Sequence, residues 1–251
     1  MTDLIALGLP GYLVIFATLL VAYTIFGIAG FGTALVASPI LALYVPVSQI
    51  VPLLALLDLG AAVVNVSRDG RQANWQELRR LVPLMIVGSL IGAAILLTTR
   101  PDFLLLALGV FVVGYSLYSL SGLKPDREFS PRHALPFGAI GGVFSALFGS
   151  GGFIYAIYLS GRLRDKNALR ITQTTLIGMS TLTRVVLFTV AGVYLDTRLL
   201  WLALLLAPGM LVGITLGRRL TLKMSREQFL KVINLVVLAS GLMLIGRYFT
   251  A

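Results

Sequence analysis

Gly27-Ile-Ala-Gly-Phe-Gly32 interrupts one long apolar segment of the sequence, and Gly149-Ser-Gly-Gly152 interrupts a second, 119 residues after Gly30. A glycine cluster inside an apolar segment breaks a helix and leaves backbone N–H and C=O groups without helical partners. In hydrocarbon, each such group costs several kcal/mol unless protein, water or a ligand bonds to it. Two breaks at matching places in the two halves of a membrane-spanning chain are typical of the binding site of a secondary transporter.

The composition places the rest of the chain in a membrane. Of its 251 residues, 58% are hydrophobic and 12% are charged, and the mean hydropathy is +0.95. These values are typical of a polytopic membrane protein. Cys is absent and the one histidine, His133, lies in a charged loop, so we expect no disulfide, no metal and no cofactor. The net charge of +10 fits Lys and Arg in cytoplasmic loops better than nucleic-acid binding.

Six segments are long and apolar enough to cross a hydrocarbon core of about 30 Å. Two more segments, Leu4–Val45 and Ala134–Ser160, contain the glycine breaks. The second is about 27 residues long with its break in the middle, which favours a re-entrant pair of half-helices over a single crossing. The six full spans are Gln49–Val66, Leu81–Thr98, Phe103–Leu120, Leu169–Val190, Leu199–Leu216 and Phe229–Gly246. Aromatic side chains near the predicted ends are expected at the membrane interfaces, namely Tyr12, Tyr23, Trp75, Tyr194 and Trp201.

The distribution of Lys and Arg supports this re-entrant hairpin. If Ala134–Ser160 enters and leaves on one side, 16 of the 20 basic residues lie in inside loops. If it crosses once, nine of them move outside, which the positive-inside rule disfavours. Both chain ends, at Thr2 and Thr250, are then expected outside. The four inside loops are 67–80, 121–133, 161–170 and 217–231.

Each half of the chain then holds one broken hairpin and three full spans, and because three is odd, the second half is inverted relative to the first. We therefore predict an all-α polytopic membrane protein of two inverted repeats, 1–123 and 124–251, each with one glycine-broken re-entrant hairpin and three transmembrane helices. Both repeats also carry glycines four residues apart in equivalent spans, for which we expect close helix packing. These are Gly88 and Gly92 in the first repeat and Gly209, Gly213 and Gly217 in the second.

Ionisable groups inside the spans mark candidate functional sites, and Asp58 and Arg184 are two such groups. Asp58 shares a helix face with Asn65, and Arg184 shares one with Gln173 and Ser180, because seven and eleven residues return close to the same direction at about 100° per residue. At the 119-residue offset Asn65 corresponds to Arg184, so a polar group is expected at the same depth beside each break.

These side chains suggest an anion site with a coupled proton. Arg184 offers planar, bidentate donors for an oxyanion, and the alternatives are snorkelling to an interface or a structural pair with Asp58. Asp58 is a candidate proton carrier, with pairing or packing as the alternatives. Asn65, Gln173 and Ser180 are candidate substrate contacts.

The breaks carry chemistry of their own. Half-helices that start after Gly32 and Gly152 point N-terminal N–H groups and positive dipole ends into the membrane, and two that meet there form an anion site. Valine at Gly32 or Gly151 is then expected to abolish transport more than it reduces the amount of folded protein, although the glycines could serve close packing alone. The predicted site residues on the breaks are Gly30, Gly32, Thr33, Gly149, Ser150, Gly151 and Gly152, with hydroxyl donors from Thr33 and Ser150.

With Gly30-Phe-Gly-Thr-Ala-Leu-Val-Ala-Ser-Pro39-Ile-Leu41 in the first half and a second glycine-rich break at mid-chain, the sequence resembles the TauE/SafE sulfite exporter family over nearly its whole length. The resemblance implies a multi-pass protein of the cell's inner (plasma) membrane that exports sulfite, sulfonates or other small organic anions. An anionic substrate agrees with the half-helix N-termini and Arg184.

Several functions compete with a proton-linked carrier of small sulfur-containing anions. A passive anion channel and a carrier of another small carboxylate or organic anion remain open. A membrane enzyme would need a paired nucleophile and base, which the sequence lacks, and the absence of a P-loop argues against ATP as the energy source. The expected partners are a small anion and membrane lipids but no nucleic acid, and a homodimer is compatible with the sequence.

Overall fold

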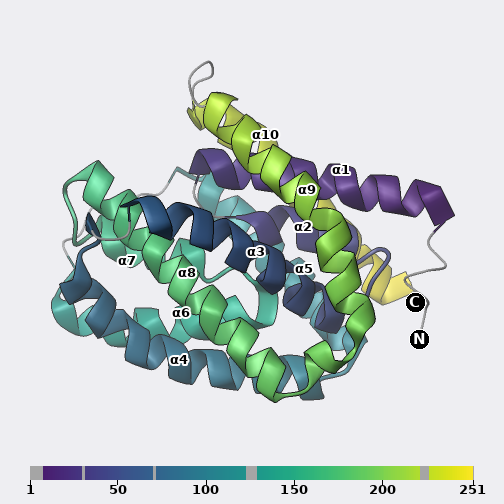
Figure 1. Ribbon diagram of the computed structural model, residues 1–251, viewed down its shortest axis with the longest axis horizontal. Helices are drawn as coiled ribbons and strands as arrows, with labels where there is room; N and C mark the ends of the chain where they lie inside the picture. Colours follow the sequence, from purple (N-terminus) through teal and green to yellow (C-terminus); the bar gives the residue numbers. More distant parts are fainter. Residues whose placement is uncertain (1–7, 30–31, 70–71, 123–128, 221–225, 251) are drawn as a thin grey trace.

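The computed structural model describes residues 8–29, 32–69, 72–122, 129–220 and 226–250, and every regular element in these ranges is a helix (Figure 1). The prediction of an all-helical membrane protein is therefore confirmed. The first half contains α1 (Gly8–Ala29), α2 (Thr33–Leu41), α3 (Val47–Asp69), α4 (Trp75–Thr98) and α5 (Pro101–Leu120). The second half contains the 3-10 helix η3 (Pro131–His133), α6 (Ala134–Phe148), α7 (Gly152–Ser160), α8 (Lys166–Val190), the 3-10 helix η4 (Val193–Leu195), α9 (Thr197–Leu220) and α10 (Arg226–Thr250).

Each of the six predicted spans lies inside one helix, namely α3, α4, α5, α8, α9 or α10. Within the described residues, three helices combine the length and the hydropathy of a membrane span: α4, α5 and α9 as far as Gly217. Shorter apolar stretches lie in α1, α3 and α10. Helix α8 differs because its buried face carries polar side chains, among them Thr172, Gln173, Ser180, Thr181 and Arg184.

Local sequence explains where the functional helices begin. The Asp165 side chain accepts a hydrogen bond of 2.7 Å from the Ala168 N–H and so caps α8. Asn74 caps α4 in the same way, accepting from the Glu77 N–H at 3.2 Å. Such caps satisfy N–H groups that have no acceptor within the helix. The cap at Asp165 therefore fixes where α8 begins.

Helices α6 and α7 form an antiparallel pair around the second glycine break. The rings of Phe137 and Tyr158 lie 5.7 Å apart, so the end of α7 has returned to the beginning of α6. The backbone N–H of Phe129, just before α6, donates a hydrogen bond of 3.0 Å to the carbonyl of Gly161, just after α7. Both ends of this pair therefore lie together at one end of the molecule.

The corresponding segment of the first half is longer. Helix α1 has 22 residues against 15 in α6. At 1.5 Å per residue, α1 is about 33 Å long and α6 is about 22 Å long. A hydrocarbon core of about 30 Å is therefore within reach of α1 and beyond the reach of α6.

The two halves interleave rather than stand apart. Helix α6 packs along α4 (Figure 1), α1 packs along α9, α3 packs on α8 and α5 packs on α10. The closest approaches use the predicted glycines, because a Cβ on Gly92 would lie 2.5 Å from the Val143 carbonyl oxygen. A Cβ on Gly213 would lie 2.7 Å from the Leu20 carbonyl oxygen. The expectation of close helix packing at these glycines is confirmed.

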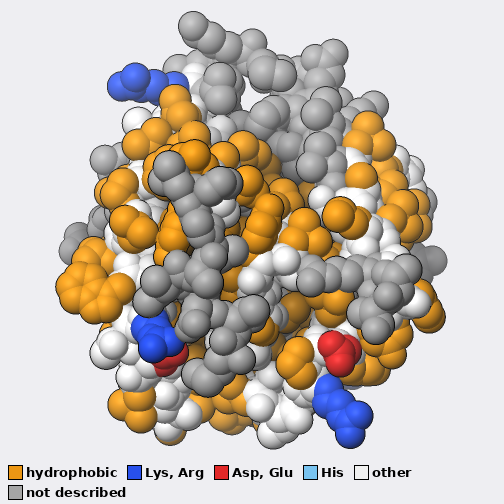
Figure 2. Space-filling view, turned by 90° about the vertical axis from the view of Figure 1, so that its right-hand side faces the viewer, with side chains coloured by type: hydrophobic (Ala, Val, Ile, Leu, Met, Phe, Trp, Pro, Cys, Tyr) orange, Lys and Arg blue, Asp and Glu red, His pale blue; other side chains and the backbone are white. Residues whose placement is uncertain are grey.

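Hydrophobic side chains cover most of the coloured part of the face in Figure 2, and charged side chains on it are few. Large apolar residues are exposed on several helices, for example Val110 on α5, Ile140 on α6 and Leu204 on α9. A surface of this kind is stable when lipid covers it. The interior, by contrast, holds the polar groups around the two breaks.

Candidate functional site

The two glycine breaks meet at a small cavity inside the protein. Its volume is about 20 Å³, which is room for about one water molecule. The first turns of α2 and α7 both face it, and their leading N–H groups have no acceptor within the helix. The cavity is lined by Phe26, Gly32, Thr33, Leu35, Asp58, Gly149, Ser150, Gly152, Phe153 and Ile177.

Glycine is needed at the breaks for two different reasons. Gly32 has φ +100° and Gly149 has φ +69°, which is the left-handed region that side chains avoid. Gly151 has an ordinary φ of −64°, but a Cβ there would run into the Gly141 carbonyl oxygen and lie 2.7 Å from the Ser145 Cβ. At Gly32 space is not the reason, since no atom of the described residues lies within 4 Å of a Cβ placed on it.

Asp58 of α3 stands at the floor of the cavity, with 5% of its surface exposed. Its Oδ1 accepts a hydrogen bond from the Tyr23 hydroxyl and another from the Thr33 hydroxyl, each 2.9 Å long. Its Oδ2 lies 3.6 Å from Nη2 of Arg184, which is an ion pair longer than a direct hydrogen bond. Asp58 therefore ties α1, α2, α3 and α8 together at the first break.

Arg184 of α8 is 2% exposed and only partly satisfied. Its Nη2 donates a hydrogen bond of 2.9 Å to the Thr181 hydroxyl. Its Nε and Nη1 are buried and have no hydrogen-bond partner among the described residues. Nη1 points at the second break, because a Cβ on Gly149 would lie only 3.1 Å from it. A buried guanidinium with two nitrogens unpartnered among the described residues, beside helix N-termini, is an arrangement that favours an anion.

The other predicted site residues on α8 face the α6–α7 pair. The Gln173 amide nitrogen lies 3.5 Å from the Gly152 carbonyl oxygen, and the Ser180 hydroxyl lies 2.7 Å from that of Ser145. The Ser150 hydroxyl donates to the Phe148 carbonyl at 3.2 Å. These contacts place the three residues around the second break, and their role toward a substrate stays a prediction.

Two predicted site residues fall outside what the structure describes. Gly30 lies between the described ranges 8–29 and 32–69. Asn65 lies on α3, but its side chain is outside the described part of the chain. The correspondence between Asn65 and Arg184 therefore stays a prediction from the sequence.

Sequence reasoning missed several residues of the site. Tyr23 was expected at a membrane interface, which is wrong: it is fully buried and bonds Asp58. It lies four residues before the first break in an apolar helix, where no local pattern marks a buried phenol. Thr181, one helical turn before Arg184, was also missed, although its spacing could have indicated a contact.

A second polar cluster, also missed, lies where α4 begins and α7 ends. Glu77 is buried there and accepts a 2.7 Å hydrogen bond from the Tyr158 hydroxyl on Oε2. Its Oε1 accepts from Nη2 of Arg162 at 2.8 Å and from Nη1 of Arg80 at 2.7 Å. The hydrogen bonds to Glu77 and the charge of its carboxylate raise the pKa of the Arg162 guanidinium above its ordinary value. The cluster fastens the end of α7 to α4, and the Asn74-x-x-Glu77 pattern, typical of a capped helix start, could have pointed to it.

Comparison with known proteins agrees with this picture. Residues 15–244 match the family described as "Sulfite exporter TauE/SafE". The chain is also similar to the "Probable inner membrane transporter protein TsaS" of Comamonas testosteroni, with 26% identity over 196 residues that cover 76% of this chain and 81% of that protein. No solved structure matches the chain.

The family match spans most of the sequence, from within α1 to within α10, and includes both breaks, Asp58 and Arg184. The resemblance drawn from the glycine breaks is thereby confirmed. Together with the apolar helices, the comparison makes this an inner-membrane transporter and not an enzyme. The chain belongs to the sulfite exporter TauE/SafE family.

Proposed function

We propose that this protein is a secondary transporter that exports small sulfur-containing anions, such as sulfite and sulfonates, and holds them where α2 and α7 begin. The observation that carries the proposal is Arg184, whose Nε and Nη1 are buried and have no hydrogen-bond partner among the described residues, with Nη1 beside Gly149 of the second break. Leading N–H groups of two helices and a guanidinium supply the donors that an oxyanion requires. The family name supports this substrate class, and the relative's description as a transporter supports transport as the function.

We propose that Asp58 is the group that couples anion binding to protonation. Its ionised carboxylate lies 3.6 Å from Arg184 and repels an anion that approaches the same guanidinium. Protonation of Asp58 removes that repulsion and releases Arg184 for the substrate. In this mechanism the proton and the anion occupy the site together and cross in the same direction, and the two gradients together set the direction of net flux.

The helix contacts support alternating access between two inverted repeats, residues 1–123 and 124–251. In the two repeats α1 corresponds to α6, α3 to α8, α4 to α9 and α5 to α10. When each helix is replaced by its counterpart, the α1–α9 contact becomes the α6–α4 contact, and the α3–α8 and α5–α10 contacts are unchanged. The cavity has room for about one water, so a sulfite-sized anion needs one of the broken hairpins to move. The Glu77–Arg162–Tyr158 cluster holds α7 to α4, and we expect these bonds to break when α7 moves away.

The re-entrant arrangement of α6 and α7 predicts the labelling of two cysteine variants. Ser130→Cys and Ser160→Cys lie in exposed positions at the two ends of the hairpin. Their neighbours Phe129 and Gly161 are joined by a backbone hydrogen bond. Both should react with a membrane-impermeant maleimide only from the cytoplasmic side, and the native chain, which lacks Cys, supplies the unlabelled control. Thr99→Cys, between α4 and α5, should react only from outside. Labelling of Ser130→Cys and Ser160→Cys from opposite sides would contradict the model of inverted repeats.

Ligand binding tests the function itself. Because a ligand that binds the native state raises apparent stability, the purified protein should melt at a higher temperature with its substrate. Sulfite, sulfoacetate, isethionate, taurine, sulfate and lactate form the panel. We expect stabilisation by sulfite or a sulfonate, and saturable flux into liposomes that a pH gradient alters. Stabilisation by lactate alone would indicate a carboxylate carrier, and non-saturable flux insensitive to pH would indicate a channel.

A further inference from the structure

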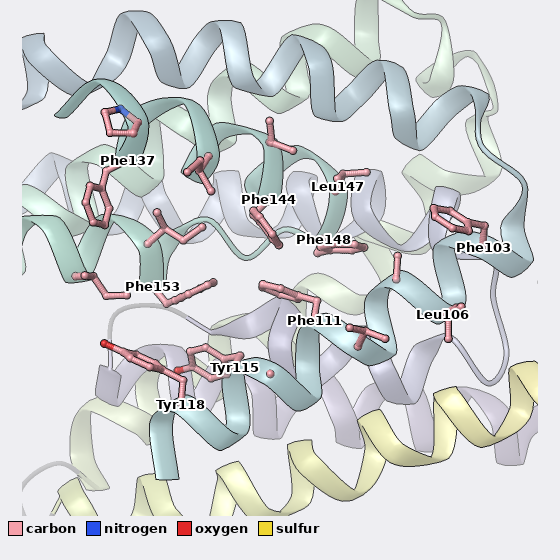
Figure 3. Close-up of a pocket in the computed structure, with 18 residues that line it drawn as sticks. Phe103, Leu106, Phe111, Tyr115, Tyr118, Phe137, Phe144, Leu147, Phe148 and Phe153 are labelled. Carbon is pink, nitrogen blue, oxygen red and sulfur yellow. The ribbon is translucent and has the colours of Figure 1, made fainter. Parts of the chain in front are cut away.

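A large apolar cavity lies beside the anion site and shares the lining residue Phe153 with it. It is a groove of about 800 Å³ between α5 and the α6–α7 hairpin (Figure 3). Only Tyr115 and Tyr118 bring polar side-chain atoms to it, and every other lining residue is apolar or a glycine. A water-soluble ligand needs placed polar groups to fix its orientation, and this groove offers almost none.

The groove is long and runs along the membrane-spanning helix α5. It extends from Phe103 in the first turn of α5 to Tyr118 in its last turn, which is about 22 Å at 1.5 Å per residue. The groove is therefore longer than one leaflet is thick, because a leaflet is half of a hydrocarbon core of about 30 Å. Val110 and Ile140, on opposite walls, are about half exposed, so the groove opens sideways toward the lipid. An extended hydrocarbon chain fits this shape.

Basic side chains lie near the end of the groove that carries the polar atoms. Figure 3 places Tyr118 and Phe137 at the same end, opposite Phe103. The Phe137 ring lies 5.2 Å from that of Phe129, which lies 5.5 Å from the ring of His133. Arg132 and His133 are both exposed there. A phosphate group at this end is complementary in charge to the Arg132 guanidinium.

We propose that the groove binds a membrane phospholipid, with one acyl chain along α5 and the phosphate beside Arg132 and His133. Phe153 gives this site a link to the rest of the protein, because its ring lines both the groove and the small cavity between the breaks. It also packs on Phe111 and Tyr115 of α5, at ring distances of 5.6 and 5.0 Å. The bound chain therefore supports the outer side of α7.

Gly114 allows the groove to be filled with little other change. Among the described residues, no heavy atom lies within 4 Å of a Cβ placed on Gly114, so the space beside it is open. Gly246 on α10 has the same open surroundings but does not line the groove. Gly114→Trp and Gly246→Trp therefore form a matched pair, and Gly114→Leu is the milder alternative if the tryptophan variant folds poorly.

Photolabelling tests the proposal directly. The purified protein is mixed with phosphatidylglycerol that carries a diazirine on one acyl chain, illuminated, and mapped by peptide mass spectrometry. We expect several-fold more adducts on the groove residues of α5 and α6 than on the exposed apolar face of α9 around Leu204 and Leu211. Gly114→Trp should lower groove labelling to the α9 level, Gly246→Trp should not, and Arg132→Ala should reduce it several-fold.

Four results would overturn the proposal. The first is equal labelling of the groove and the α9 face, and the second is groove labelling that Gly114→Trp does not change. The third is labelling of the groove by a diazirine fatty acid but not by the phospholipid. The fourth is cross-linking of two copies of the chain through Phe103 or Val110, which would make the groove a dimer interface. None of these measurements depends on the identity of the transported anion.

Discussion

Arg184→Gln is expected to lower the free energy of unfolding by roughly 3–5 kcal/mol, because removing one member of a buried ion pair strands the other. The stranded group is Asp58, whose Oδ2 has Arg184 as its only close partner at 3.6 Å among the described residues. Its Oδ1 keeps the hydrogen bonds from Tyr23 and Thr33. Thermal or denaturant unfolding of the purified protein in detergent measures the loss.

The double variant Arg184→Gln with Asp58→Asn separates the two roles of Arg184. It removes both charges, so most of the lost stability should return. If Arg184 also binds the anion, the stable double variant should still fail to bind sulfite or sulfonate. Normal binding by the double variant would contradict a ligand role.

Arg184→Lys adds a graded measurement. An ammonium keeps the charge but loses the planar guanidinium and its bidentate fork, with three N–H donors in place of five. Loss of one charged hydrogen bond in a dry site costs about 1.5–3 kcal/mol, or roughly ten- to hundredfold in affinity. An unchanged Kd in Arg184→Lys would show that charge alone is sufficient.

Gly151→Ala is expected to prevent folding of most of the protein. The backbone φ of −64° suits alanine, so the whole effect comes from space. The new Cβ would meet the Gly141 carbonyl and the Ser145 Cβ, and a helix backbone cannot yield as a flexible side chain can. Overpacking costs about 1–3 kcal/mol in ordinary cores, and this contact belongs at the upper end or beyond. The yield of monodisperse protein in gel filtration measures it.

Gly32→Ala is the matched comparison, because it changes the backbone requirement and leaves the space free. No atom in the described part of the chain lies within 4 Å of its Cβ, but φ +100° strains an L-residue by about 1–2 kcal/mol. We expect folded protein with impaired transport, because relief of the strain shifts the first turn of α2 at the cavity. The sequence predicted the same outcome for both glycines, and the structure separates them. Equal yields of the two variants would contradict this distinction.

The sequence by itself determined the features that depend on local composition. Glycine clusters in apolar segments located the ends of α1, α6 and the beginnings of α2 and α7, because glycine destabilises a helix wherever it clusters. Apolar length located the helices α3, α4, α5, α8, α9 and α10, of which α4, α5 and α9 have the length and hydropathy of a membrane span among the described residues. Asp58 and Arg184 stood out because a charge in such a span is costly and is kept only for a purpose.

Only the tertiary structure decided which groups meet. Tyr23 and Thr33 reach the same oxygen of Asp58 from positions 35 and 25 residues away, and Arg162 reaches Glu77 across 85 residues. No periodicity in the chain encodes such pairs, because the packing of α1, α2 and α7 against other helices brings them together. The same packing distinguishes the two glycines. A Cβ on Gly151 would run into the Gly141 carbonyl oxygen, whereas a Cβ on Gly32 would meet no atom of the described residues within 4 Å. A sequence shows that a position is glycine, but whether a side chain is excluded there by a neighbouring atom or by the backbone angle can be seen only in the folded protein.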